Sequence, residues 1–412
     1  MSPLMNWSEN FTFESTAVEQ PHSIEQLQDI VANADRAKAV GTRHCFTRIA
    51  DSPGGVLVDT SQLDVGVTVD HDAMTATVPA GWSYSRICAE LESQGVALPN
   101  MASLPHISIA GATATGTHGS GNTNQILSAV ISGIQLVDGQ GELRTIERGH
   151  PDLPALSVGL GAFGIFTTMT VDVEPSFRVT SAYYRDTSWQ NLLDNLDEVM
   201  ASAYSVNLHA TYSDANVRGI WNKFRLTEGK SFDVPDEVFG MARVEGQLTP
   251  GKNTIINEAG PWSERLAHFI PESAPSVAGD ELQTEYFVDR KHGVAAINAL
   301  RGMGADLDQH LHGTEIRTVA SDDLWLSPCY QRETLSLGMT WRKHEPEVLA
   351  LLPRMEEALA PFEARPHWGK LFSYDRAALL KQFVHLDNAL DLASSYDPNR
   401  TFHNPYLERI GN

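Results

Sequence analysis

Cysteine is scarce in this 412-residue sequence, which contains only Cys45, Cys88 and Cys329. An odd number at such wide spacing excludes a disulfide framework, and there is no CxxC pair to hold a metal ion. His310 and His312 form the only close histidine pair, so we predict no metal site. Reduced thiols of this kind are typical of the cytoplasm.

Long hydrophobic runs are absent as well. No stretch approaches the roughly 18 apolar residues that a membrane-spanning helix needs. Residues 1–13 have neither the basic region nor the apolar stretch of a secretory signal. We therefore expect a cytoplasmic protein without a membrane partner.

Positive charge is also in short supply, since 30 Lys and Arg residues stand against 52 Asp and Glu residues, for a net charge of −22. Proteins that bind nucleic acids use a basic face to displace counterions, so DNA and RNA are disfavoured as partners. Several catalytic signatures are missing too: GxSxG, HExxH, GxxxxGK[ST] and a GxGxxG turn between a strand and a helix. Their absence disfavours an acyl-transfer hydrolase, a zinc protease and a Rossmann or P-loop nucleotide site.

The hydrophobic pattern predicts an α+β fold. We expect two domains, because the chain exceeds the roughly 250 residues at which one core usually stops growing. The first part combines helices at 24–35 and 83–94 with strands at 37–41, 55–59, 67–70, 74–78, 129–136, 143–146 and 164–173. Farther along, helices at 189–200, 293–301 and 345–359 alternate with strands at 178–184, 205–211, 219–226, 281–288, 313–319 and 336–341. This alternation is typical of an antiparallel sheet with helices on one face. We expect domains at 1–175 and 176–385, and a segment at 386–412 that returns to the first domain.

The first segment that could carry chemistry is Ala39-Val-Gly-Thr-Arg-His-Cys45, which directly follows a predicted buried strand. Backbone N–H groups in such a loop can hold a phosphate or a polar ring. A neutral imidazole at His44 could act there as a nucleophile. Position alone favours an ordinary loop histidine at the surface of a domain.

The second segment, residues 109–121, is rich in glycine and in small hydroxyl-bearing side chains. Small side chains allow a ligand to approach the backbone closely, and this composition is typical of a pyrophosphate cradle. A tight glycine-rich packing corner is the structural alternative.

Three shorter segments contain isolated polar groups. Ser103 lies in an otherwise apolar loop, and Lys370 follows a tryptophan and a glycine. Glu315 and Arg317 would project from one face of a strand, where they could bind hydroxyl groups. A surface ion pair and a solvated lysine are the simpler explanations of the charged residues.

Together and in order, these segments resemble the alditol oxidases of the vanillyl-alcohol-oxidase flavoprotein family, and more distantly the aldonolactone oxidoreductases. The similarity runs along the whole chain and is strongest at residues 98–108, 114–120, 315–320, 325–328 and 365–370. It implies an N-terminal FAD-binding domain of the PCMH type and a C-terminal cap domain over the flavin. It also implies that FAD is bound covalently to His44 through the flavin 8α carbon.

The resemblance assigns roles to individual residues of this sequence. The implied cofactor-binding residues are Ala39, Val40, Gly41, Thr42, Arg43, His44, Cys45, Ser103, Ser108, Gly111, Thr115, Gly116, Thr117, His118 and Ile165. The implied polyol-binding residues are Ser103, Glu315, Arg317, Thr340 and Lys370, of which Glu315, Arg317 and Lys370 would be catalytic.

The implied activity is oxidation of the C1 alcohol of a linear polyol such as xylitol or sorbitol, with O₂ reduced to H₂O₂, by a monomer. An aldonolactone oxidase or dehydrogenase on the same fold is the nearest alternative, and a carbohydrate-binding protein without flavin is a more distant one. Three positions depart from the relatives. Arg43 and Cys45 interrupt their Gly-Ser-Gly-His-Ser pattern, and Gly338 stands where they have a histidine, which leaves the preferred substrate open.

Overall fold

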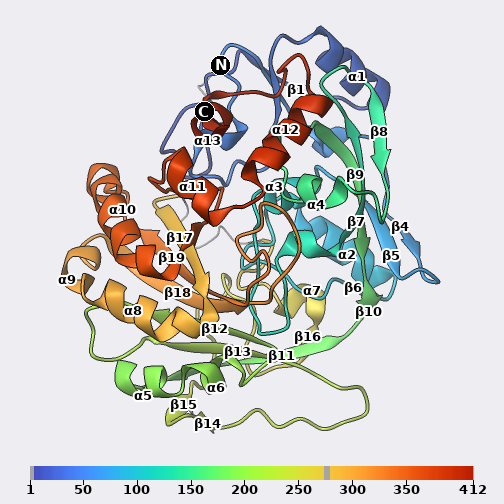
Figure 1. The fold of residues 1–412 in the computed structure, drawn as a ribbon. Coiled ribbons are helices and arrows are strands. Elements are labelled where there is room, and N and C mark those ends of the chain that lie inside the picture. Colours follow the sequence, from blue (N-terminus) through green and yellow to red (C-terminus); the bar gives the residue numbers. More distant parts are fainter. Residues whose placement is uncertain (1–3, 273–278, 412) are drawn as a thin grey trace.

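The fold was determined as a computed structural model that describes residues 4–272 and 279–411 (Figure 1). A small parallel sheet lies near the N-terminus, with β3 (Val56–Val58) between β1 (Ala17–Glu19) and β2 (Ala37–Ala39). Helix α1 (Ile24–Asn33) begins after Ser23, whose side chain accepts a hydrogen bond from the Gln26 N–H. The strand expected at 37–41 already ends at Ala39, so the segment that contains His44 is a loop from Val40 onward.

A five-stranded antiparallel sheet completes the N-terminal part. Its strands, in spatial order, are β4 (Thr68–Asp70), β5 (Thr75–Pro79), β9 (Ile165–Asp172), β7 (Ile131–Val137) and β8 (Leu143–Ile146). The hairpin expected around Asp138-Gly139 is confirmed, because β7 and β8 pair antiparallel on either side of it. The remaining elements here are α2 (Tyr84–Ser93), β6 (Val96–Ala97), α3 (Ile109–Ala114), α4 (Leu153–Leu156) and β10 (Glu174–Pro175).

A ten-stranded sheet, antiparallel at every pairing, dominates the second part of the chain. Its order is β14 (Glu237–Val238), β15 (Met241–Arg243), β11 (Arg178–Arg185), β13 (Gly219–Arg225), β12 (Ser205–Ala210), β18 (Leu311–Val319), β19 (Thr334–Trp341), β17 (Leu282–Asp289) and β20 (Arg365–Pro366), with β16 (Gly260–Pro261) paired to β11. Most of its helices lie on the side away from the N-terminal elements (Figure 1): α5 (Trp189–Asp194), α6 (Leu196–Met200), α8 (Gly293–Arg301), α9 (Gly304–Leu307) and α10 (Glu345–Leu359). Helix α7 (Trp262–Arg265) contacts α2 instead.

The single helix expected at 189–200 is wrong, because the chain breaks at Asn195 into α5 and α6. The Asn195 side-chain amide donates to the Asn191 carbonyl at 2.8 Å, the group that its own backbone N–H would use in a continuous helix. The Asn195 N–H bonds the Leu192 carbonyl instead.

The C-terminal helices α11 (Arg376–Gln382), α12 (Leu386–Tyr396) and α13 (Pro405–Gly411) lie beside the N-terminal elements (Figure 1). The Asn404 side chain donates to the carbonyls of Arg48, Ile49 and Asp51, and the Gly139 N–H donates to Tyr396. The contact begins earlier, at Gly369, whose carbonyl accepts a 2.8 Å hydrogen bond from the Phe46 N–H. The chain thus brings residues 367–370 to the junction of its two parts.

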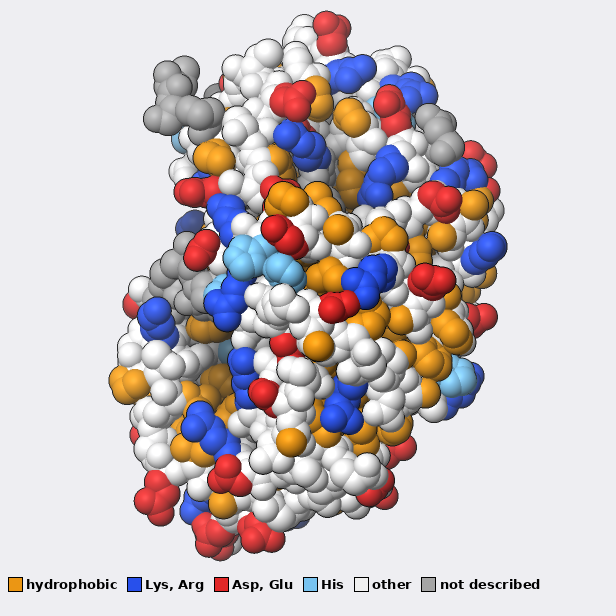
Figure 2. Space-filling model, turned by 90° about the vertical axis from the view of Figure 1, so that its left-hand side faces the viewer, with side chains coloured by type: hydrophobic (Ala, Val, Ile, Leu, Met, Phe, Trp, Pro, Cys, Tyr) orange, Lys and Arg blue, Asp and Glu red, His pale blue; other side chains and the backbone are white. Residues whose placement is uncertain are grey.

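On the face shown in Figure 2, Lys and Arg side chains are interspersed with Asp and Glu, and no continuous basic patch covers it. Within residues 4–272 and 279–411, the helices are too short or too polar to cross a bilayer.

Candidate active site

A large cavity lies at the junction between the N-terminal elements and the ten-stranded sheet. Seventeen of the predicted site residues line it: Ala39, Val40, Gly41, Thr42, Arg43, His44, Cys45, Ser103, Ser108, Gly111, Thr115, Thr117, His118, Glu315, Arg317, Thr340 and Lys370. They come from five separate stretches of the chain, so the fold gathers them into one site.

Two predicted cofactor residues do not line the cavity. Ile165 is fully buried in a core cluster with Leu27 and Val137, while its neighbours Gly164 and Phe166 line the cavity. Gly116 has a φ of +74° and packs against Pro328, so its contribution is a turn in the backbone.

The first part of the glycine-rich segment forms a short helix, α3, which the sequence pattern did not predict. The start of this helix packs closely on the His44 loop, because a Cβ on Gly41 would overlap the Ser108 hydroxyl. A Cβ on Gly111 would lie 2.8 Å from that same hydroxyl. Gly41 therefore lets the loop approach the start of α3 along one wall of the cavity, and Gly111 leaves room for the Ser108 hydroxyl within the helix itself.

The His44 ring is held by two contacts. Its Nδ1 lies 3.1 Å from the Thr42 hydroxyl, and its ring stacks on Trp7 with centroids 5.0 Å apart. Its Nε2 is buried and has no hydrogen-bond partner among the described residues. Burial, reinforced by the charges of His106 and Arg43, lowers the pKa of His44 to about 4, so the imidazole is neutral and nucleophilic near pH 7.

The opposite wall is built by strand register. Glu315 on β18, Gly338 on β19 and Glu285 on β17 lie directly opposite one another. Arg317 lies opposite Ser336 in the next row, and Thr340 lies opposite Gln283 in a third. Because cross-strand neighbours point to the same face of a sheet, these polar side chains converge on the cavity.

Arg317 and Glu315 form an ion pair, and the Arg317 guanidinium also donates to the Ser103 hydroxyl at 2.8 Å. This bond joins the sheet to the loop that precedes α3. His209 lies 3.8 Å from Glu315, and burial together with the Arg317 charge lowers the pKa of His209 to about 3. Ser103, Glu315 and Arg317 thus present a fixed set of donors and acceptors.

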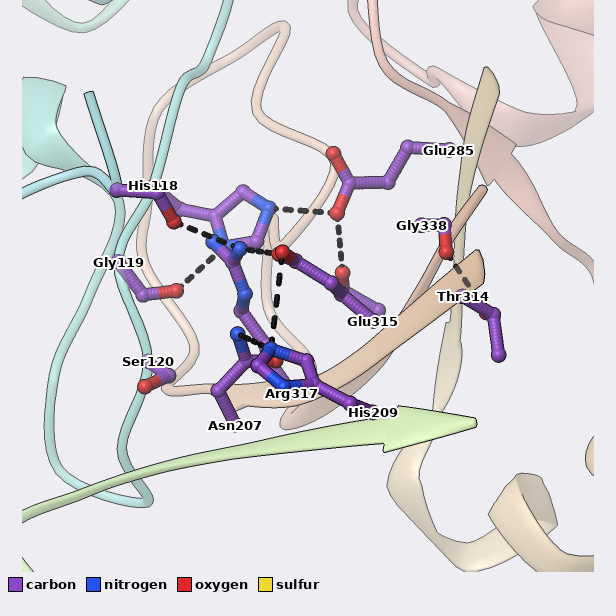
Figure 3. A network of polar contacts seen from close by, with 12 residues as sticks. His118, Gly119, Ser120, Asn207, His209, Glu285, Thr314, Glu315, Arg317 and Gly338 are labelled. Atoms are coloured by element: carbon purple, nitrogen blue, oxygen red, sulfur yellow. Dashed lines mark hydrogen bonds and ion pairs between the residues drawn. The ribbon is translucent and has the colours of Figure 1, made fainter. Parts of the chain in front are cut away.

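Glu285 was missed in the sequence, although it connects three parts of the site. Its carboxylate lies 3.0 Å from His118 Nε2 (Figure 3). It also lies 2.7 Å from the Lys370 ammonium and accepts a hydrogen bond from Ser336. Burial alone would raise the pKa of this carboxyl, but the Lys370 charge and His118 hold it well below its usual range. His118 Nδ1 lies 2.7 Å from the Gly119 carbonyl. Both ring nitrogens of His118 therefore lie within hydrogen-bond distance of an acceptor, which fixes the orientation of the ring.

Gln283 and Glu285 stand two positions apart in a predicted strand, so period two placed them on one face and could have drawn attention to Glu285. Trp7 was missed as well, and nothing in the sequence around it indicated a site. Cys45 lines the cavity, but burial raises the pKa of its thiol to about 12, which makes it a poor nucleophile.

Comparisons with known proteins agree with this geometry. Residues 15–147 match the family described as FAD binding domain, and residues 280–410 match D-arabinono-1,4-lactone oxidase. The alditol oxidase of a Streptomyces species is 37% identical over 98% of each chain. The L-gulono-1,4-lactone dehydrogenase of Mycobacterium tuberculosis is 28% identical over 100% of this chain and 99% of its own. The solved cholesterol oxidase from B. sterolicum has a TM-score of 0.82 at 16% identity, covering 100% of this chain and 96% of its own.

An FAD-binding domain and a sheet domain that share one cavity define a two-domain flavin-dependent oxidoreductase of the vanillyl-alcohol-oxidase type, as the sequence predicted. Within that class, the near full-length match places the chain in the alditol oxidase family.

Proposed function

We propose that the protein oxidises the C1 hydroxyl of a linear polyol such as xylitol or sorbitol to the aldose, with O₂ reduced to H₂O₂. The observation that carries this proposal is the convergence of Ser103, Glu315, Arg317, Thr340 and Lys370 on one cavity. A neutral, many-hydroxylled substrate matches such a wall, because each fixed donor or acceptor finds a hydroxyl partner.

The residues present fit FAD. The close approach of Gly41 and Gly111 to Ser108 leaves a backbone-lined wall for the pyrophosphate, and His44 has an unpartnered nitrogen in the same cavity. We propose that His44 holds FAD covalently and that Ala39–Cys45 and Ser108–His118 surround it. Bound FAD supplies the hydride acceptor that no protein side chain can provide.

The protein's own groups would orient and polarise the substrate. Arg317 and Lys370 are placed to hold the reacting oxygen and to stabilise the negative charge that develops when its proton leaves. Glu315 and Ser103 would bind neighbouring hydroxyls, and both are fixed by Arg317. Glu285 keeps the Lys370 ammonium in place at 2.7 Å.

An aldonolactone is the second candidate substrate, because the part of the chain that includes β17, β18 and β19 matches D-arabinono-1,4-lactone oxidase. Gly338 bears on this choice. A Cβ there would lie 3.2 Å from a Glu285 carboxylate oxygen and 3.3 Å from the Glu315 carbonyl, so a larger side chain would alter the pocket.

Addition of xylitol, sorbitol or gulono-lactone to the purified protein without oxygen tests the proposal. We expect either polyol to bleach the flavin absorbance faster than the lactone, and air to restore the colour with H₂O₂ released. Bleaching by the lactone alone would instead favour the second candidate, and a colourless protein would refute both. A dye acceptor in place of O₂ distinguishes an oxidase from a dehydrogenase.

His44→Ala tests the covalent link. After acid precipitation, we expect the wild-type pellet to remain yellow, whereas the variant should release its flavin into the supernatant. Flavin in the variant pellet, or none in the wild-type pellet, would show that His44 is not the attachment site. The monomeric state and cytoplasmic location expected from the sequence stay predictions.

A further inference from the structure

Residues 4–13, here called the N-terminal strap, lie along the loop that contains His44. Hydrogen bonds run in both directions between them: Trp7 N–H to the Arg43 carbonyl at 2.8 Å, Arg43 guanidinium to the Met5 carbonyl at 3.1 Å, Asn6 amide to the Cys45 carbonyl at 3.0 Å and Asn10 amide to the Phe46 carbonyl at 3.3 Å. The strap thus holds the backbone on both sides of His44.

The strap is itself well ordered by internal and cross-domain contacts. Asn6 is buried, and its side-chain carbonyl accepts from the N–H groups of Asn10 at 3.0 Å and Phe11 at 3.3 Å. The Ser8 hydroxyl donates to the Glu281 carbonyl, which lies just before β17 on the substrate side. The strap therefore bridges the two parts of the molecule beside the cavity.

Trp7 gives the strap its contact with the reactive ring. The indole stacks on the His44 imidazole at 18° between planes, packs edge-on against Phe46 and lines the same cavity. Stacking fixes the plane of the imidazole, and the Thr42 hydroxyl at Nδ1 fixes its rotation within that plane. Arg43 has a φ of +61°, an unfavourable conformation that its bonds to Met5 and Trp7 help to hold.

We propose that Trp7 is a positioning residue that holds the His44 imidazole in the orientation needed for covalent attachment of FAD. This inference rests on the proposed link at His44. The bond joins an imidazole nitrogen to the 8α carbon. The imidazole N–H and one 8α C–H are lost as two protons, and two electrons remain on the flavin ring. O₂ takes up these two electrons and two protons and becomes H₂O₂. A small rotation of the imidazole away from the 8α carbon would slow this step, because such reactions depend steeply on alignment.

Trp7→Ala and Trp7→Phe, compared with wild type, test the proposal. The readouts are total flavin by absorbance and linked flavin by intact mass and by fluorescence of the denatured protein. We expect Trp7→Ala to bind FAD but to link it about tenfold more slowly after expression, and Trp7→Phe to restore most of the rate. The ratio of linked to total flavin is decisive, since a merely structural loss would lower both together.

Trp325→Ala is the matched control, because Trp325 is also half-buried and stacks on a histidine, His385, at 5.1 Å, but neither residue lines the cavity. It should link FAD at the wild-type rate. If Trp7→Ala does not fold, Trp7→Leu replaces it, since leucine keeps apolar volume without a ring plane. A wild-type rate of flavin linkage in Trp7→Ala, or in Trp7→Leu where it replaces Trp7→Ala, would overturn the proposal. A wild type that carries only releasable flavin would refute the link at His44 itself, a result that the same denatured samples reveal.

Discussion

The Glu285 carboxylate is the residue on which the polar part of the site depends. It is 5% exposed, and Lys370, His118 and Ser336 all donate to it. A buried carboxylate is costly unless enough donors surround it, so the folded state needs all three donors. The donors in turn would lose their acceptor if the carboxylate were removed. One side chain of β17 thus connects His118, which follows α3, with Lys370 and Ser336.

Glu285→Gln should destabilise the protein strongly, although glutamine has almost the same shape as glutamate. The substitution leaves the Lys370 ammonium without its paired carboxylate, and the amide cannot accept from Lys370, His118 and Ser336 together, so we expect the free energy of unfolding to fall by roughly 3–5 kcal/mol. Urea denaturation followed by circular dichroism measures this. Asp306→Asn removes an exposed partner of Arg354 and should cost only about 0–1 kcal/mol. Equal losses in the two variants would contradict the role of Glu285.

At the scale of elements, two packing relations shape the site: the His44 loop against α3, and the register of β18, β19 and β17. The loop can approach α3 only because residue 41 lacks a Cβ. The register determines which side chains face the cavity, and a shift of one residue would turn Glu315 and Arg317 to the other face.

Gly41→Ala should therefore lower flavin binding. The new methyl group overlaps the Ser108 hydroxyl, so the loop and α3 must separate and the cofactor wall loses its shape. We expect the ratio of flavin to protein absorbance to fall several-fold after purification. Gly66→Ala is the control, because Gly66 has open space around its Cβ position and no positive φ, and it should keep the wild-type ratio. A fully loaded Gly41→Ala protein would show that this contact does not form the cradle.

At the scale of the whole molecule, several histidines are buried and neutral in the folded protein. They make the free energy of unfolding depend on pH. Burial, together with nearby cations, lowers the pKa of both His209 and His367 to about 3. The unfolded chain binds protons on them from about pH 6.5 downward, whereas the folded protein does not. The contribution of these two histidines to the free energy of unfolding is therefore fully present above about pH 6.5, and it is lost progressively as the pH falls toward 3.

We accordingly expect the urea midpoint to be clearly lower at pH 5 than at pH 7, with a loss on the order of a few kcal/mol. His367→Asn should reduce this dependence, because an asparagine oxygen can accept the Gly369 N–H bond now made to His367 Nδ1 without titrating. Identical urea midpoints at pH 5 and pH 7 would show that the buried histidines do not cause a pH dependence of stability. The same would follow if His367→Asn showed the wild-type difference between the two midpoints.

The sequence alone indicated most of the strands, the α+β class, and which short segments could hold a cofactor or bind hydroxyl groups. These properties follow from local periodicity, from the freedom that glycine allows and from the resemblance of the motifs. The break at Asn195 and the helix at 109–114 were not apparent, because they depend on one side-chain bond and on packing against Gly41.

Only the tertiary structure decided which of the candidate groups meet. Glu285 reaches Lys370 and His118, and Trp7 reaches His44, across 85, 167 and 37 positions of the chain respectively. Such pairs leave no periodic trace in sequence, because contacts between distant segments arise from strand register and from the return of the C-terminal chain. For the same reason, the buried charges and the neutral histidines became apparent only once the surrounding groups were in place.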